Sequence, residues 1–220
     1  MNNITVKLQE LLNVAKALPQ IELGGDTSAE DNWIMGLTTE YYNDRVTSVC
    51  AKCFQGNQVL TAAYFPKATE VGANAFTNCS RLAHIDIPLV TKINNYSFQY
   101  CYALQSVCLP IVTSVGSSAF AGCNSLYIVD IPVVTKFWKW AFSNCSALEA
   151  LLLRSADSVS ELVNADALNN TRIASGTGYI YVPAALVDSY KAATKWSNYA
   201  AQFRALEDYT VDGTITGELN

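Results

Sequence analysis

The sequence has few charged residues, and no stretch of it stays apolar for long. Of its 220 residues, 14 are Lys or Arg and 19 are Asp or Glu, so that 15% are charged and the net charge is −5. The basic residues form no cluster, so the chain lacks the basic face that a nucleic-acid binder requires. No apolar run approaches the roughly 18 residues of a membrane helix. We therefore expect neither nucleic-acid binding nor membrane insertion.

No export signal is expected, and cysteine does not reach the density of a disulfide scaffold. The first residues contain no basic segment followed by an apolar stretch and a small-residue cleavage site, so we expect no signal peptide. Seven cysteines are too few for a disulfide scaffold in a chain this long, and the odd number leaves at least one without a partner in the chain. Half of the residues are hydrophobic, which excludes disorder and suffices for the core of one domain.

A 22-residue repeat occupies the middle of the chain. Phenylalanine, threonine and proline each recur at this interval, and no insertion breaks the register between residues 47 and 156. One unit reads Thr-x-Val-x-x-x-Ala-Phe-x-x-Cys-x-x-Leu-x-x-Ile-x-Ile-Pro. The recurring residues are Phe54, Phe76, Phe98, Phe120 and Phe142, then Thr47, Thr69, Thr91, Thr113 and Thr135, and then Pro66, Pro88, Pro110 and Pro132.

The length and pattern of the unit predict a parallel-sheet solenoid. Alternation at the end of the unit, as in Ile85-Asp86-Ile87, indicates a strand with one buried face. A unit of this length is too short for a crossover helix with two loops, so the chain must return through a short irregular arc. Coils of this kind stack at a strand spacing of roughly 4.8 Å, and equivalent side chains then form continuous apolar columns. We predict an α/β repeat fold.

The segments 71–79 and 115–123 resemble the BspA-like class of leucine-rich repeats. They read Val-Gly-Ala-Asn-Ala-Phe-Thr-Asn-Cys and Val-Gly-Ser-Ser-Ala-Phe-Ala-Gly-Cys. The resemblance implies a right-handed leucine-rich-repeat solenoid on bacterial surface proteins and phage-encoded proteins, used for adhesion and recognition and without catalytic residues. The first unit departs from the pattern at Cys50, Cys53 and Asn57, and the last departs at Trp138.

Five regions follow from these patterns. Apolar residues spaced by three and four in residues 1–18 predict a helix, which either caps the open end of the solenoid or joins copies of the chain as a short coiled coil. The expected regions are an N-terminal helix at 1–20, a linker at 21–45, five leucine-rich repeats at 46–156, a C-terminal capping region at 157–206 and a tail or hairpin at 207–220.

Beyond residue 156 the repeat loosens. Val159 still follows Phe137 at the repeat interval, but Asn164 occupies the phenylalanine column. Residues 178–182 predict a final strand, and residues 196–203 show helical spacing of apolar side chains. Asp-Gly at 212–213 indicates a terminal hairpin. The closing stretch, 173–213, and the segment 43–48 resemble repeat proteins of phages and prophages of gut Firmicutes, and release by lysis would explain a missing signal peptide.

The aligned cysteines predict a buried ladder. Asn57 takes the cysteine position in the first unit, and asparagine can replace neither a thiolate ligand nor a disulfide partner. The later units carry Cys79, Cys101, Cys123 and Cys145. Cys50 and Cys53 form a lone CxxC pattern, which we interpret as drift of the repeat. We expect no cofactor and no metal.

The expected strands place two rows of side chains on the outward face. The rows are Ala62, His84, Ser106, Ile128 and Ala150, and Tyr64, Asp86, Cys108, Asp130 and Leu152. His84, Asp86 and Cys108 are the residue types of a thiol nucleophile with its base and orienting group. However, residues i and i+2 of a strand lie roughly 7 Å apart, and a flat sheet offers no cleft. We therefore predict no catalytic residues and no enzyme.

Aromatic residues outside the core columns indicate function instead. They stand where the repeat usually carries small or polar residues, and exposed Tyr and Trp on a rigid frame are typical of recognition surfaces. The alternative is that several of them only pad the convex arc. Tyr96 belongs to this set, and the predicted ligand-binding residues are Tyr100, Tyr102, Tyr127, Trp138 and Trp140. We also expect a surface ion pair between Glu70 and Lys92.

Together these features predict a non-enzymatic leucine-rich-repeat binding protein that mediates surface attachment. The predicted location is a phage virion, in a tail or head fibre, or the bacterial cell surface. The expected partner is a host or surface protein or a glycan, with other virion proteins and a homo-oligomer through residues 1–18 as further partners. The alternative is a purely structural virion component, a decoration or stalk without an external ligand.

Overall fold

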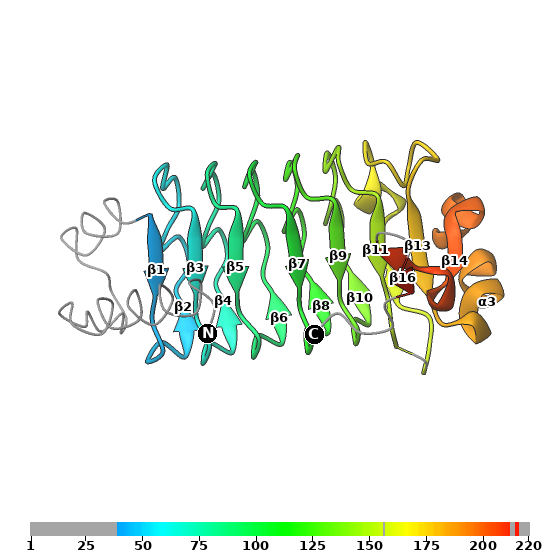
Figure 1. Cartoon of the computed structure of the whole chain (residues 1–220), viewed down its shortest axis with the longest axis horizontal. Coiled ribbons are helices and arrows are strands. Elements are labelled where there is room, and N and C mark those ends of the chain that lie inside the picture. The colour runs from blue at the N-terminus through cyan, green and yellow to red at the C-terminus, as the bar shows by residue number, and fades with distance from the viewer. Residues whose placement is uncertain (1–38, 156, 212–213, 216–220) are drawn as a thin grey trace.

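The chain winds as an elongated stack of coils, seen in a computed structural model that describes residues 39–155, 157–211 and 214–215 (Figure 1). Each repeat contributes two short parallel strands, one to each of two rows. The first row contains β1 (Glu40–Tyr42), β3 (Ala62–Tyr64), β5 (His84–Asp86), β7 (Ser106–Cys108), β9 (Ile128–Asp130), β11 (Ala150–Leu152), β13 (Tyr179–Val182) and β14 (Phe203–Ala205). The second contains β2 (Ser48–Val49), β4 (Glu70–Val71), β6 (Lys92–Ile93), β8 (Ser114–Val115), β10 (Lys136–Phe137) and β12 (Glu161–Leu162).

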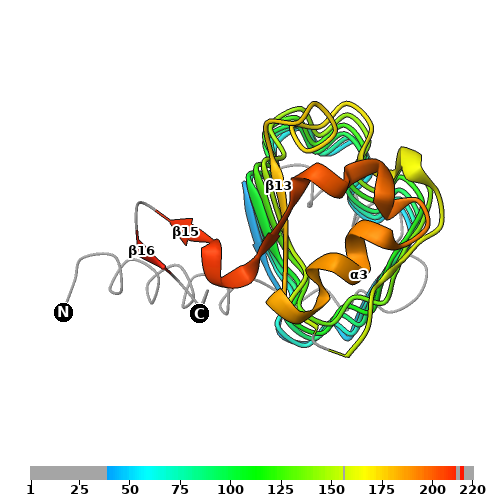
Figure 2. The same ribbon diagram turned by 90° about the vertical axis from the view of Figure 1, so that its right-hand side faces the viewer.

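The strand register confirms the solenoid. Ala62 pairs with His84, and Ser106 pairs with Ile128, so equivalent residues of successive units lie side by side. Within the repeats a third side, formed by irregular arcs, completes each coil (Figure 2). β1 pairs with β3 in the same register, so the strand row starts one coil before residue 46, within the segment that the sequence assigned to a linker.

The phenylalanine column forms the centre of the core. Rings of adjacent units stack with centroids 4.9 to 5.3 Å apart and with their planes within 5° of parallel. The leucines of the repeat are fully buried beside them. Such parallel stacking shows that the coils are related almost by translation alone, as the unbroken spacing predicted. The rings are those of Phe54, Phe76, Phe98, Phe120 and Phe142.

The cysteine column confirms the predicted buried ladder. The four thiols are free and buried, and each Sγ donates to the carbonyl of a phenylalanine in the preceding coil, at 2.9 to 3.2 Å. Burial raises the pKa of Cys79 to about 12, which keeps this thiol protonated and able to donate. In the first unit, Asn57 Oδ1 accepts from the backbone N–H groups of Val59 and Leu60 instead, at 2.9 and 2.8 Å.

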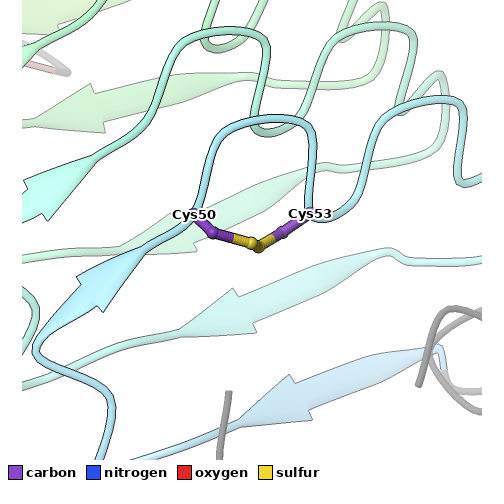
Figure 3. The surroundings of a disulfide bond; sticks show 2 residues. All are labelled: Cys50 and Cys53. Atoms are coloured by element: carbon purple, nitrogen blue, oxygen red, sulfur yellow. A yellow bond between two sulfur atoms is a disulfide. The ribbon is translucent and has the colours of Figure 1, made fainter. Parts of the chain in front are cut away.

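The interpretation of the CxxC pattern as drift was wrong, because Cys50 and Cys53 form a disulfide (Figure 3). A tight turn brings them together: the N–H of Cys53 donates to the carbonyl of Cys50 at 3.4 Å, and Lys52 between them has a φ of 65°. The two Cα atoms are therefore 5.4 Å apart, within the range that a disulfide spans. The disulfide fastens the arc of the first unit.

Loss of this disulfide should destabilise the fold moderately. Closing so short a loop removes little entropy from the unfolded chain, so we expect the Cys50→Ser/Cys53→Ser variant to lose about 2 kcal/mol of unfolding free energy. Urea denaturation with and without reductant measures the effect. The wild type should shift on reduction to the midpoint of the double variant, and the variant should not respond to reductant. Equal midpoints for the oxidised wild type and the variant would contradict the expectation.

The repeat continues beyond residue 156 with a shifted register. Phe137 pairs with Leu162 rather than with Val159, so the interval is longer here than in the earlier units. The N–H of Phe142 donates to the carbonyl of Ala167 at 2.8 Å, in the bond pattern that joins earlier units. Leu168, which follows, is 1% exposed and takes the phenylalanine position. Because this unit is longer, the phenylalanine position does not fall at Asn164, where the constant interval placed it. Asn164 instead caps a 3-10 helix.

The C-terminal part combines short helices with two more strands of the first row. Its helical elements are η1 (Ala165–Leu168), η2 (Ala184–Leu186), α3 (Val187–Ala192), η3 (Trp196–Gln202) and η4 (Leu206–Asp208). β13 is not the final strand as expected, because β14 starts at Phe203 and pairs with it in parallel. This start also ends the predicted helix at Gln202. The expected hairpin is confirmed, since β15 (Thr210–Val211) pairs antiparallel with β16 (Thr214–Ile215).

Helices lie across the end of the stack (Figure 2). The ring of Trp196 packs edge-on against Phe137, with centroids 5.9 Å apart, and its Nε1 donates to the carbonyl of Ser160 at 2.7 Å. The apolar side of the last coil is thereby covered. The predicted helix at 1–20 and its assembly role at 1–18 lie outside the described residues. Within the described ranges, no helix has the length and apolarity needed to cross a membrane.

Candidate binding surface

The outward face of the first strand row holds the residue types considered for catalysis. His84, Asp86 and Cys108 are exposed on β5 and β7. The His84 ring packs against Tyr64 at a centroid distance of 5.3 Å. Partial burial and the charge of Asp130 raise the pKa of the Cys108 thiol, so the thiolate that a nucleophile needs is disfavoured. This chemistry does not point to a catalytic site.

The outward rows are less open than the sequence predicted. Ala150 and Leu152 are buried, because Tyr209 of the C-terminal segment packs on them. Asp130 is 3% exposed and is paired with Arg154, whose Nε lies 3.0 Å from its Oδ1. The alternation predicted which side chains point outward, but a distant segment of the chain decides which of them reach solvent.

The expected ion pair between Glu70 and Lys92 is not present. Glu70 Oε1 instead accepts from Asn94 Nδ2 at 3.1 Å. In the same strand row, Lys136 pairs with Glu161 at 2.9 Å. Because the last coil contains extra residues, Glu161 lies beside Lys136. A constant repeat interval does not predict this pairing.

All the aromatic residues singled out in the sequence lie on the third side of the coils. Three successive arcs carry them, residues 94–105, 116–127 and 138–149, each of which leads from the second strand row to the first. We call this set the aromatic arc surface. It comprises Tyr96 (38% exposed), Tyr100 (39%), Tyr102 (45%), Tyr127 (45%), Trp138 (40%) and Trp140 (41%).

Two columns of the arc require left-handed backbone. The turn takes a positive φ at the same two places in each repeat, which suits glycine and asparagine and opposes bulky side chains. Tyr96, Tyr100 and Trp140 occupy these places with φ near 60°. The first column is Lys52, Asn74, Tyr96, Ser118 and Trp140, and the second is Gly56, Asn78, Tyr100, Gly122 and Asn144.

The tyrosine pair depends on a glycine of the next coil. A Cβ added at Gly122 would lie 2.5 Å from Cδ1 of Tyr100, so the ring of Tyr100 rests where a side chain would otherwise be. Tyr102 packs beside it with a centroid distance of 6.0 Å. Glycine at position 122 therefore permits both the left-handed turn and the position of the Tyr100 ring.

Each residue of the tryptophan pair, Trp138 and Trp140, has a lysine ammonium group over its ring. Lys136 Nζ lies 4.6 Å from the ring centroid of Trp138, and Lys139 Nζ lies 3.7 Å from that of Trp140. These are cation–π distances, and such contacts restrict the rings while leaving them partly exposed.

The residues of the aromatic arc surface do not all come together. Trp138 and Trp140 share one coil, Tyr100 and Tyr102 share the coil two steps away, and Tyr127 lies on the coil between, next to β9. Tyr96 was outside the predicted ligand-binding set, although it stands in the same column as Trp140. Asn74 at the equivalent position is the sequence signal for the left-handed backbone, because asparagine tolerates a positive φ. The signal is found only when the units are aligned.

Comparison with known families identifies most of the repeat region. Residues 34–149 match the family described as "BspA type Leucine rich repeat region", with six copies. The chain belongs to this family. The six copies agree with a strand row that starts one coil before residue 46.

Solved structures similar to this BspA-type chain come from bacteria. One is a leucine rich cell surface protein from Faecalibacterium prausnitzii A2-165, with 28% identity and a TM-score of 0.52 over 55% of this chain and 33% of that chain. The T. pallidum leucine rich repeat protein TpLRR has 27% identity and a TM-score of 0.45, over 50% and 53% of the two chains. A leucine-rich repeat protein from Bacteroides ovatus ATCC 8483 has 27% identity and a TM-score of 0.42, over 63% and 47%.

This chain thus spans between a third and about half of the length of these structures. Among curated proteins, a search finds no significant match.

Proposed function

We propose that this BspA-type chain is a non-enzymatic recognition module of a cell-surface protein and binds its partner through the aromatic arc surface. The observation that carries the proposal is the exposure of six Tyr and Trp side chains, each 38 to 45% exposed, on arcs of a rigidly stacked repeat. Large aromatic side chains with few rotatable bonds contribute much contact area at little entropic cost. They are also the residues that dominate binding energy at interfaces.

The cell-surface location is supported by the similarity to the surface protein of F. prausnitzii. Location on a phage virion stays a prediction from the resemblance of residues 173–213 and 43–48 to phage and prophage repeat proteins. The partner class of this proposal is a surface protein or glycan, as for other recognition modules that act outside the cell.

A structural role without an external ligand is the second candidate, and a separate feature favours it. Leu89, Ile111 and Val133 stand in one column of three successive coils and are 45%, 39% and 41% exposed. We call this column the aliphatic stripe. It lies after the proline of each repeat, away from the arcs, and packing of solenoids against each other would cover it.

Arrays of surface proteins and glycans, probed with the full chain, test the proposal. The variants use residues that the repeat itself places at equivalent positions: Tyr100→Gly, as at Gly122, and Trp138→Gly, as at Gly116. Leu89→Ala is the control on the aliphatic stripe. We expect a ligand whose affinity falls about 10-fold or more in both arc variants and stays unchanged in the control. Absence of any ligand, with self-association that Leu89→Ala abolishes, would favour the structural role.

A further inference from the structure

On the aromatic arc surface, the arc between Tyr96 and Trp140 carries small residues. We call these two side chains the walls. Tyr96 and Trp140 occupy the same column two coils apart, and Ser118 lies between them in the same left-handed conformation. Because the core rings are parallel within 5°, equivalent backbone positions project their side chains in the same direction. Ser118 is only 4% exposed although it lies on the outer arc, next to Gly116 and Ser117. Two large side chains thus flank a low strip, residues 116–118.

The distance between the walls matches a particular peptide conformation. Successive core rings here are 5.2 and 5.3 Å apart, so equivalent positions two coils apart are separated by roughly 10 Å, close to two strand spacings. A polyproline II helix has three residues per turn and rises about 3.1 Å per residue, so it presents the same face roughly every 9.3 Å. A peptide of this kind along the stack axis would place one residue against Tyr96 and the third residue after it against Trp140.

The charge of the surface fits an uncharged ligand. Residues 94–105 and 116–127 contain no charged side chain. At the third arc Lys136 and Lys139 lie over the two tryptophan rings, and Lys136 and Glu149 are already paired with Glu161 and Arg172. Neither a polyanion nor a strongly basic peptide finds complementary charges there. A proline-rich segment meets this condition, since its rings are apolar and its backbone lacks a donor at each proline.

The hydrogen-bonding groups of this surface suit a peptide backbone. A bound ligand needs free partners for its polar groups, and Glu149, the carboxylate of these arcs, is already paired with Arg172. Asn94 Nδ2 already donates to Glu70 and to the carbonyl of Val71, and Asn95 Oδ1 already accepts from the N–H of Ser117. The remaining donors include the Tyr hydroxyl and Trp indole groups beside the exposed amides of Asn95 and Gln105, and donors of this kind suit the solvated carbonyls of a polyproline II helix.

Backbone conformation gives an independent reason for assigning a role to these two aromatics. A bulky residue with positive φ is conformationally costly, and such residues persist mainly where function retains them. Asn74 fills the same column at a φ of 59°, which shows that the turn itself does not require an aromatic side chain.

We infer that the aromatic arc surface binds a proline-rich segment in the polyproline II conformation, laid along the stack axis over Ser118 and held by Tyr96 and Trp140. The inference rests on the proposed function and names the class of its ligand. Aromatic residues on protein surfaces recognise proline-rich segments in this way because the peptide is already ordered before it binds.

Fluorescence polarisation with the full chain tests it, using labelled decaproline and a Gly-Ser peptide of equal length as probes. We expect saturable binding of decaproline and none of the Gly-Ser peptide. Tyr96→Asn and Trp140→Asn, which introduce the residue type found at Asn74, should each weaken decaproline binding about 10-fold or more, and Leu89→Ala should leave it unchanged. Urea midpoints for the two asparagine variants, equal to or above that of the wild type, will show that they are folded.

Two results would overturn the inference: decaproline that does not bind saturably, and binding that survives both asparagine substitutions. A glycan or a folded protein that binds in place of decaproline, and is lost in Trp140→Asn, would refute the ligand class and leave the proposed function standing. If no array ligand and no decaproline bind, both proposals fail.

Discussion

Replacing Phe98 by alanine is expected to lower the free energy of unfolding by about 3–5 kcal/mol. The ring is fully buried and stacks between those of Phe76 and Phe120, with centroids 5.2 Å away on each side. Truncation would leave a cavity in the middle of the column. Because each coil is stabilised by its neighbours, a weak central coil weakens the interfaces on both sides.

Chemical denaturation followed by circular dichroism measures this loss, and two further variants serve as controls. Phe98→Leu keeps an apolar side chain in the column, as Leu168 does in a later coil, so it should cost clearly less than alanine. Tyr102→Ala removes a ring that is 45% exposed on the same coil and should change stability little. If Phe98→Ala and Tyr102→Ala lower the free energy of unfolding equally, the phenylalanine column does not stabilise the array as described.

The stack of coils could be predicted because its cause is local and repeated. Each unit has the same side-chain pattern, and the five rings at equal intervals can be buried together only if equivalent residues lie side by side. The cysteine ladder followed from the same logic, since one Asn57 in the column excluded metal and disulfide chemistry for the whole set. Repetition therefore supplied many consistent observations for each prediction.

Other features depend on contacts or backbone angles that one unit does not reveal. The disulfide between Cys50 and Cys53 arises from a tight turn that later units form without cysteine, for example with Gly72 and Ala75 at the same positions. The added residues before Leu162 shift the register, so a fixed repeat interval missed the next coil. Tyr209 covers part of the outward face although it is distant in sequence from the strands it packs on. These are properties of conformation and tertiary packing.

The aromatic arc surface has some features that the sequence predicts and others that only the structure reveals. The positions of its Tyr and Trp residues could be found from the columns, because they break a small or polar pattern. The strain at Tyr96 and Trp140 could have been inferred from Asn74 in the same column, whereas the space that Gly122 gives to the ring of Tyr100 is visible only in three dimensions.

Replacing Arg154 by methionine is expected to cost about 3 kcal/mol, because it leaves a buried carboxylate without its cation. Arg154 Nε donates to both oxygens of Asp130, at 3.0 and 3.1 Å. The Asp130 side chain is 5% exposed, so water can replace the lost partner only poorly. The Arg154 side chain is 22% exposed, which places the expected loss at the lower end of the range for buried pairs.

A double-mutant cycle separates the pair from its surroundings. Asp130→Leu/Arg154→Met removes both charges and keeps apolar volume beside Leu152, so it should recover most of the stability that Arg154→Met loses. Urea denaturation of the four proteins gives the coupling energy. If the double variant is as unstable as Arg154→Met, the cost comes from lost packing of the arginine stem rather than from an unpaired charge. Recovery would show that the ion pair contributes little net stability and that the loss in Arg154→Met comes from the unpaired carboxylate.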